Sequence, residues 1–231
     1  MGIADVILGI KIKRTNLGIS SSQSHYIEKV LKKFNCENSS IAHSPMEANI
    51  RLMPNTGLTI SQLKYSQVIG CLMYAMTSTR PDIAYAVGRL SRYTSNPSSH
   101  HWSVVMHVLK FLKNTKDFAL TFSGNPSVLE GYSDASWITN PEDNSSTSGW
   151  VFLLEGGAIS WASKKQTCIM TSTMESEFVA LAAAGKEAEW LRNLVHDKRI
   201  HLCETWSIAD FGSFVGLKLL YAHERIRILG L

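Results

Sequence analysis

The sequence lacks paired cysteines, long apolar runs and a signal peptide. Its four cysteines are far apart in the 231 residues and no Cys-x-x-Cys occurs, which argues against a zinc site and predicts reduced thiols. The longest apolar runs, such as residues 71–76, are too short to span a membrane. The N-terminal residues lack a basic start followed by an apolar core. We therefore expect a cytoplasmic or nuclear protein with no membrane partner.

Charge is scarce and unevenly distributed. Hydrophobic residues make up 45% of the chain and charged residues 18%, a composition typical of a globular protein. Residues 1–126 hold 14 Lys and Arg against 6 Asp and Glu, whereas residues 127–231 hold 9 against 13. A basic half followed by an acidic half suits a polyanion path that leads to a metal site, although ordinary surface charge gives a similar count.

The first 60 residues predict a hairpin, one helix and a linker. Residues 6–13 alternate as a strand, a turn follows at 15–18, and residues 18–21 return. Ser24 is the expected N-cap of a helix over residues 25–34, which carries lysines on its outer face. Residues 35–60 are rich in Asn, Ser and Pro and predict an extended linker.

Three helices and a strand are expected next. Helical spacing of apolar residues covers 62–76, then a helix that begins at residues 79–82 and runs to about 94, then 100–114. Thr79 is the expected cap of the second helix and precedes an early Pro81. Residues 118–122 form a short strand. His100, His101 and His107 fall in the third helix. Neighbouring helical residues point to different sides, and no acid or cysteine completes a ligand set, so helix capping or solvent contact is the favoured role.

The second half predicts three strands followed by a helix. Residues 128–137 contain Asp134, two apolar runs at 149–154 and 158–162 are joined through Gly156-Gly157, and a helix begins after Ser172. The fold class is therefore α+β or α/β: a helical segment followed by a three-stranded antiparallel meander and a helix that lies on it.

Two glutamates near the start of that helix have different expected roles. Glu175 stands three residues after Ser172, which is the capping-box spacing. Glu177 leads an otherwise apolar row, so it is expected to point toward the sheet. Asp134 is expected to point inward too, and two converging acids suit a hard divalent cation such as Mg²⁺, for which Mn²⁺ can substitute. The alternative is that Asp134 bonds its own backbone and Glu177 is half exposed.

Four blocks, at residues 132–137, 145–154, 159–166 and 172–181, resemble the ribonuclease H domain of copia-type retrotransposon polyproteins. The resemblance implies that Asp134 and Glu177 are catalytic residues that bind Mg²⁺ and cleave the RNA strand of an RNA·DNA hybrid. Residues 1–34 resemble the end of the reverse transcriptase palm and the start of its thumb, and residues 77–87 resemble the connection segment. No two aspartates are adjacent, so no polymerase activity is expected.

The resemblance stops after Leu194. The family continues with a strand that ends in a third acid and a segment that carries a fourth, and neither block occurs here. Asp210 imitates the third acid by position only. Because two-metal hydrolysis needs several carboxylates, we expect one weak Mg²⁺ site and impaired or lost hydrolysis. We also expect a sheet edge and part of the helix face to be uncovered.

The expected divisions are residues 1–34, the linker 35–60, connection helices 61–126, a truncated ribonuclease H-like domain 127–197 and a divergent tail 198–231. The expected nucleic-acid contacts are basic residues of the second and third helices and of the third strand: Arg80, Arg89, Arg92, Lys110, Lys164 and Lys165. The main alternative to an enzyme is a non-catalytic module that grips nucleic acid through its phosphates.

Overall fold

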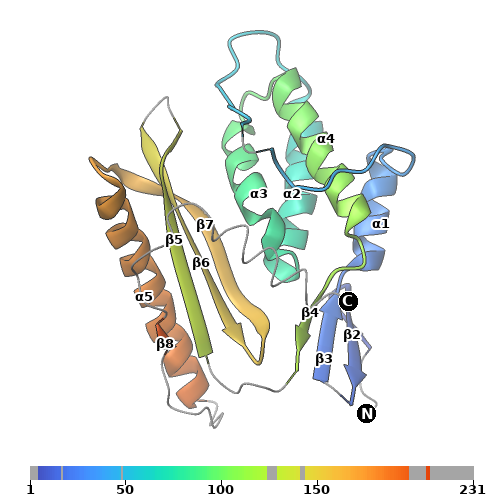
Figure 1. Cartoon of the computed structure of the whole chain (residues 1–231). Coiled ribbons are helices and arrows are strands. Elements are labelled where there is room, and N and C mark those ends of the chain that lie inside the picture. Colours follow the sequence, from blue (N-terminus) through green and yellow to red (C-terminus); the bar gives the residue numbers. More distant parts are fainter. Residues whose placement is uncertain are drawn as a thin grey trace. The chain divides into compact units, whose positions relative to one another are not determined.

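A computed structural model describes residues 5–16, 18–47, 49–123, 129–140, 144–197 and 207–208. The chain folds as two compact units. Unit 1 takes in most of residues 1–120, and unit 2 takes in residues 15–19 and most of residues 121–229. Figure 1 shows the helices α1 to α4 in unit 1 and the helix α5 in unit 2.

The N-terminal hairpin differs from its prediction at one point. The expected single strand over residues 6–13 is broken into β1 (Val6–Ile7) and β2 (Ile10–Thr15), which pair antiparallel. Leu8 and Gly9 both adopt positive φ, at 50° and 77°, so the chain reverses between the two strands. With β3 (Gly18–Ser22) and β4 (Ala119–Phe122) they form a sheet in the order β1-β2-β3-β4.

The helices of unit 1 lie close to where apolar spacing predicts them. They are α1 (Ser24–Lys33), α2 (Gln62–Ser78), α3 (Ala84–Leu90) and α4 (Ser99–Asn114), and two short 3-10 turns, η1 (Pro81–Ile83) and η2 (Ser91–Tyr93), flank α3. Two predicted caps are wrong. The N-cap of α1 is Gln23 rather than Ser24, and Thr79 ends α2 instead of starting the next helix.

The core of unit 1 is a single apolar cluster. It takes residues from all four helices, among them Ile27, Leu72, Val87 and Leu109. The expected linker holds neither helix nor strand within its described residues 35–47 and 49–60, yet Leu52 is buried in the same cluster. The linker is therefore part of the packed unit rather than a loose connection.

The predicted meander of unit 2 is confirmed, with longer strands. β5 (Leu129–Asn140), β6 (Ser145–Leu154) and β7 (Gly157–Ile169) pair antiparallel. The turn between β6 and β7 uses Gly156 at a φ of 80°, which favours glycine. A fourth strand that was not predicted, β8 (Ser207–Ile208), pairs in parallel with Glu130 and Gly131, giving the order β7-β6-β5-β8. The edge of β5 is therefore covered over those two residues, in place of the uncovered edge that we expected.

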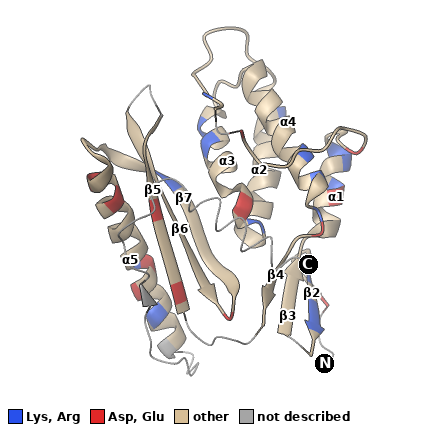
Figure 2. Cartoon of the chain, in the orientation of Figure 1, with Lys and Arg blue, Asp and Glu red and all other residues tan. Residues whose placement is uncertain are grey.

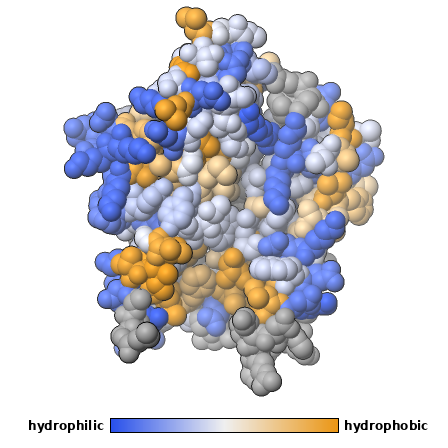
Figure 3. Space-filling model, turned by 180° about the vertical axis from the view of Figure 1, so that it is seen from behind, coloured by the Kyte–Doolittle hydropathy of each residue, from blue (hydrophilic) through white to orange (hydrophobic). Residues whose placement is uncertain are grey.

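Helix α5 (Thr173–Asp197) packs against β5 and β6. Leu129 and Phe152 of the sheet are buried with Ala184 and Leu191 of the helix. Three large apolar side chains on the other sides of α5 are exposed, at 69%, 63% and 57%: Met174, Phe178 and Trp190. This matches the expectation that part of the helix face is uncovered. Figure 3 shows apolar side chains reaching the surface in several places.

No described helix is long and apolar enough to cross a membrane.

Candidate metal and nucleic-acid site

The first turn of α5 is capped as its sequence predicts. The Ser172 hydroxyl accepts a hydrogen bond from the backbone N–H of Glu175 at 3.2 Å. The Glu175 carboxylate in turn accepts hydrogen bonds from the backbone N–H and the hydroxyl of Thr171, at 2.7 and 2.9 Å. These bonds lower the pKa of Glu175, with the backbone donor contributing most. Glu175 is therefore a structural residue that stabilises the helix terminus.

Glu177 lies at the margin of the helix face that meets the sheet. The buried residues of α5 are Ser176, Ala180, Ala184 and Leu191, so the inward row is led by Ser176. Glu177 is partly buried beside that row. Glu177 was predicted to head the inward row, but the residue before it, Ser176, does so. The carboxylate sits where a polar group can reach both the edge of the interface and solvent.

Asp134 lies in β5 opposite Gly149 of β6 and is partly buried. Side chains alternate between the two faces of a strand, and Leu129 packs against α5. Residues 129–136 pair without a register shift, so Asp134 belongs to the face of β5 that α5 does not cover. The expectation that Asp134 points inward beneath the helix is therefore wrong, because its parity is opposite to that of Leu129 and Ala135.

A buried glutamine connects the levels of the two acids. The Gln166 side-chain amide donates hydrogen bonds of 2.8 Å to the Ser148 hydroxyl and 2.8 Å to the Ser176 carbonyl. Ser148 pairs with Ala135, next to Asp134, and Ser176 precedes Glu177. Gln166 therefore links the part of the sheet next to Asp134 to the turn of α5 that carries Glu177. Figure 2 shows acidic residues on both β5 and α5. Sequence analysis assigned no role to Gln166, because an uncharged amide in a strand carries no distinctive spacing.

The two predicted lysines of β7 lie on opposite faces of the sheet. Lys164 pairs with Ser148, on the α5 side, and its ammonium lies 4.9 Å from the ring centre of Trp150. Lys165 pairs with Thr147, on the same face as Asp134 and two strands away. Both side chains are exposed. Lys165 is thus the better placed of the two for a phosphate near Asp134.

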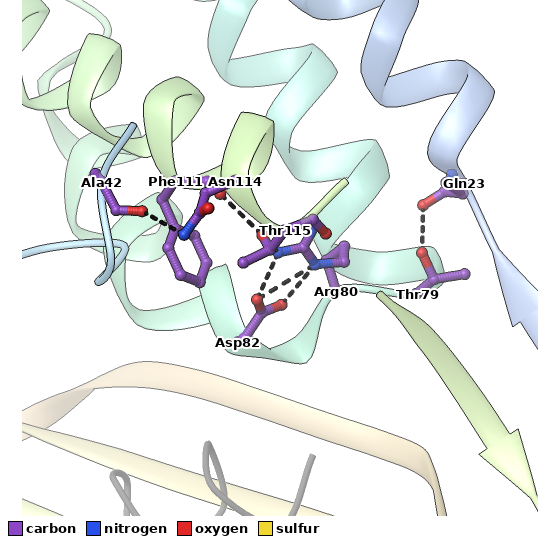
Figure 4. A network of polar contacts seen from close by, with 8 residues as sticks. All are labelled: Gln23, Ala42, Thr79, Arg80, Asp82, Phe111, Asn114 and Thr115. Carbon is purple, nitrogen blue, oxygen red and sulfur yellow. Dashed lines mark hydrogen bonds and ion pairs between the residues drawn. The ribbon is translucent and has the colours of Figure 1, made fainter. Parts of the chain in front are cut away.

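The structure gives Arg80 and Arg89 packing roles. Arg80 is 1% exposed, forms a 2.7 Å ion pair with Asp82 and donates a 3.0 Å hydrogen bond to the Thr115 carbonyl (Figure 4). Arg89 is 8% exposed and donates to the Tyr85 hydroxyl at 3.2 Å. Buried guanidinium groups with protein partners are not at the surface for phosphates, so both are removed from the expected contacts. The partly exposed Arg92 and Lys110 stay as predictions.

The histidines and the remaining acids do not add to a metal site within the described part of the chain. His101 is buried and forms a capping box with Ser98, which confirms a capping role for it. No group of three or more His, Cys, Asp or Glu side chains that could hold one metal ion occurs among the described residues. Asp210 lies outside them. Asp134 and Glu177 stay a predicted pair of metal ligands, and the described residues add no third His, Cys, Asp or Glu to them.

No protein-family model matches the chain, and no solved structure matches it. Several curated proteins do. The chain is 38% identical over 226 residues to the retrovirus-related Pol polyprotein from transposon TNT 1-94 of Nicotiana tabacum, a match over 94% of this chain and 17% of that polyprotein. It is 34% identical over 197 residues to the corresponding polyprotein from transposon RE2 of Arabidopsis thaliana, over 84% of this chain and 14% of that protein.

A shorter relative matches nearly end to end. The secreted RxLR effector protein 161 of Plasmopara viticola is 43% identical over 133 residues, which cover 57% of this chain and 94% of that protein. The chain thus spans only a small share of the polyproteins but most of this effector. Because the polyprotein matches cover most of its residues, this chain belongs to the family of Pol polyproteins of copia-type retrotransposons and corresponds to a segment of one.

Proposed function

We propose that this segment of a Pol polyprotein binds an RNA·DNA hybrid and holds one Mg²⁺ through Asp134 and Glu177, with hydrolysis of the RNA strand impaired or lost. Because Asp134 is on the sheet face opposite α5, the two side chains would meet around the edge of β5, which β8 covers only at Glu130 and Gly131. The observation that supports the proposal is that Gln166 bonds both Ser148, which pairs with the neighbour of Asp134, and Ser176, the neighbour of Glu177. The class of substrate comes from the resemblance of residues 132–181 to copia-type ribonuclease H domains, and the match to Pol polyproteins agrees with that resemblance. The proposed location is the cytoplasm or nucleus, with no small-molecule cofactor.

The donor set suits one cation better than two. Mg²⁺ prefers oxygen ligands and keeps several waters, so two carboxylates suffice for weak binding, and Mn²⁺ accepts the same donors. A bound cation would polarise a phosphate oxygen or a water molecule. Two-metal hydrolysis needs ligands for a second cation about 3.5–4 Å away, and the described residues offer no further acid in the group. Weak or absent cleavage follows from that donor count.

The sheet face that carries Asp134 is the proposed approach for the nucleic-acid backbone. Lys165 shares this face, whereas Lys164 extends over Trp150 on the face that α5 covers. Changing Lys165 to Ala should remove about one phosphate contact and lower the slope of log K against log salt by about 1. Lys164→Ala is the matched control and should leave the slope unchanged. Equal slopes for the two variants in fluorescence anisotropy titrations would remove Lys165 from the site.

A non-catalytic binding module is the second candidate, and the lysines of unit 1 favour it. Lys29, Lys32 and Lys33 of α1 are exposed. Lys110 and Lys113 of α4 lie close enough to Cys36, just after α1, to oppose the rise in the pKa of its thiol that burial causes. These lysines form a basic surface at the end of α1 that needs no acid and no metal to hold phosphates.

Cleavage and binding of an end-labelled RNA·DNA hybrid separate the two candidates. The purified chain is assayed in Mg²⁺ and in Mn²⁺ beside Asp134→Asn and Glu177→Gln, and Mn²⁺ binding is followed by calorimetry. We expect hybrid binding, Mn²⁺ binding lost in both variants, and little or no cleavage. Hybrid binding without any Mn²⁺ binding would establish the non-catalytic module instead. Strong cleavage by the wild type that both variants abolish would show that hydrolysis is retained, and Asp210→Asn would then test the third acid.

A further inference from the structure

The contact between α5 and the sheet changes character along the helix. Toward its C-terminal half it is apolar, with Phe152 against Ala184 and Leu191. Beneath its first turn it is polar: Gln166, Ser148 and Ser176 are 5%, 4% and 0% exposed. Polar groups are costly to bury unless they are hydrogen-bonded. Apolar side chains would also hold a helix on a sheet, so this polar contact, here called the seam, points to a specific role for its hydrogen bonds.

Gln166 acts in this seam as a double donor. Both of its 2.8 Å hydrogen bonds use Nε2, one to β6 through the Ser148 hydroxyl and one to α5 through the Ser176 carbonyl. The amide oxygen of Gln166 is buried with no hydrogen-bond partner. The side chain of Gln166 thus uses its NH₂ group for the Ser148 hydroxyl and the Ser176 carbonyl and leaves its own oxygen unsatisfied. These two bonds connect β7 to β6 and to α5 at one point.

That point lies one residue from Glu177 and, on the strand next to β5, opposite the neighbour of Asp134. Ser148 pairs with Ala135, the neighbour of Asp134, and Ser176 is the neighbour of Glu177. Sliding α5 along the sheet by one turn would move Glu177 by about 5 Å, and it would first have to break the bond to Gln166. On the helix side the apolar part of the interface consists of alanine and leucine, which allow such a shift more easily than a hydrogen bond does.

We propose that Gln166 is a positioning residue that fixes the first turn of α5 against β6 and so sets Glu177 at the level of Asp134. The geometry of this proposal comes from the two hydrogen bonds of Gln166. Its role in metal binding rests on the metal site proposed above. Gln166→Leu removes both bonds at similar volume. Gln166→Glu has the stronger effect, because a carboxylate places an acceptor against the Ser176 carbonyl.

The matched control is Ser160→Ala. The Ser160 hydroxyl donates a 2.6 Å hydrogen bond to the Glu187 carboxylate, so it also links β7 to α5, but ten residues beyond Glu177. Two measurements are made on each full-length variant: amide hydrogen exchange of residues 176–181, and Mn²⁺ affinity by calorimetry. In Gln166→Leu we expect at least tenfold faster exchange in this turn and Mn²⁺ affinity weakened 10–100-fold, the range found for residues that orient metal ligands. Ser160→Ala should change neither by more than about twofold.

The two readouts fail independently. Unchanged exchange in Gln166→Leu, or equal acceleration in Ser160→Ala, overturns the positioning role. Unchanged Mn²⁺ affinity in Gln166→Leu alongside loss in Glu177→Gln overturns it too, since Glu177 would then bind without Gln166. If the wild-type chain binds no Mn²⁺, the proposed metal site fails, and the exchange measurement alone decides whether Gln166 holds the first turn.

Discussion

Unit 1 buries 22 apolar residues in one cluster, whereas the corresponding cluster among the described residues of unit 2 has four. Unit 1 adds a buried ion pair, and unit 2 adds the hydrogen bonds of Gln166 and Ser160 between sheet and helix. A large apolar core fixes many elements at once. In unit 2 the register between α5 and the sheet depends on a few specific contacts, and these lie where the two candidate ligands are. Unit 1 is therefore a rigid scaffold, whereas in unit 2 the position of α5 on the sheet can change where the candidate ligands lie.

The largest effect is expected for Arg80→Ala in unit 1. The guanidinium joins the start of η1 to the end of α4 through Asp82 and Thr115, and the rings of Phe111 and Phe118 flank it at 5.7 and 5.5 Å. Removing one partner of a buried ion pair leaves the other charge uncompensated. Unit 1 should lose about 3–5 kcal/mol in its free energy of unfolding.

Urea denaturation followed by circular dichroism measures this loss. The exposed Arg51→Ala is the control and should change the free energy by less than about 0.5 kcal/mol. A loss below about 1 kcal/mol for Arg80→Ala would place Arg80 at the surface, and the residue would return to the list of phosphate contacts.

In unit 2 the next largest effect is expected for Gly131→Val. A Cβ at Gly131 would lie 2.5 Å from the Phe152 ring, which packs over the bare backbone of β5. Pushing that ring out of the small core should cost about 1–3 kcal/mol. Gly149→Ala in β6 is the control, because its Cβ would come no closer than 3.6 Å to any atom. Thermal melts of both variants provide the comparison, and equal midpoints would mean that the core of unit 2 has room for the ring to move.

A pH effect between about pH 5.5 and pH 7.5 is expected in unit 1 from His101. Burial lowers the pKa of His101, whose Nδ1 accepts a hydrogen bond from the backbone N–H of Ser98. Protons then bind the unfolded chain more readily than the folded one. Stability is therefore constant above about pH 6.5 and falls as the pH drops below it, by at most about 1.4 kcal/mol per pH unit for one proton.

Urea midpoints of the wild type and of His101→Gln at pH 7.5 and pH 5.5 test this. The variant should lose the part of the pH dependence that His101 causes, while the exposed neighbour His100→Gln should keep it. An unaltered dependence in His101→Gln would assign it to another group.

Periodicity and turn residues predicted most elements, including α2, α4 and the meander, because local apolar spacing determines them. What failed depended on partners distant in sequence. Thr79 is a residue type that often caps helices, but its hydroxyl donates to the Gln23 side chain 56 residues away. Gln23 in turn is the N-cap of α1 although its side chain makes no capping hydrogen bond. Arg80 and Arg89 are buried rather than available as phosphate contacts for the same reason, because they donate to the distant carbonyls of Thr115 and Ile50. The face of Asp134 was missed because an apolar pattern gives the parity of a strand but not which side a later helix covers.

The smallest effect compares the units directly with one substitution in each. Gly70 lies in α2 and Gly185 in α5, both are exposed, and a Cβ at either would meet no atom within 4 Å. Alanine should therefore stabilise each helix by up to about 1 kcal/mol. In unit 1 the gain should appear in full in the unfolding of the whole unit, because α2 is buried in the common core. In unit 2 it appears in full only if α5 and the sheet unfold together. If Gly185→Ala slows amide hydrogen exchange in α5 but leaves the unfolding transition of the sheet unchanged, α5 opens separately from the sheet. The hydrogen bonds of Gln166 would then decide whether Glu177 stays at the level of Asp134.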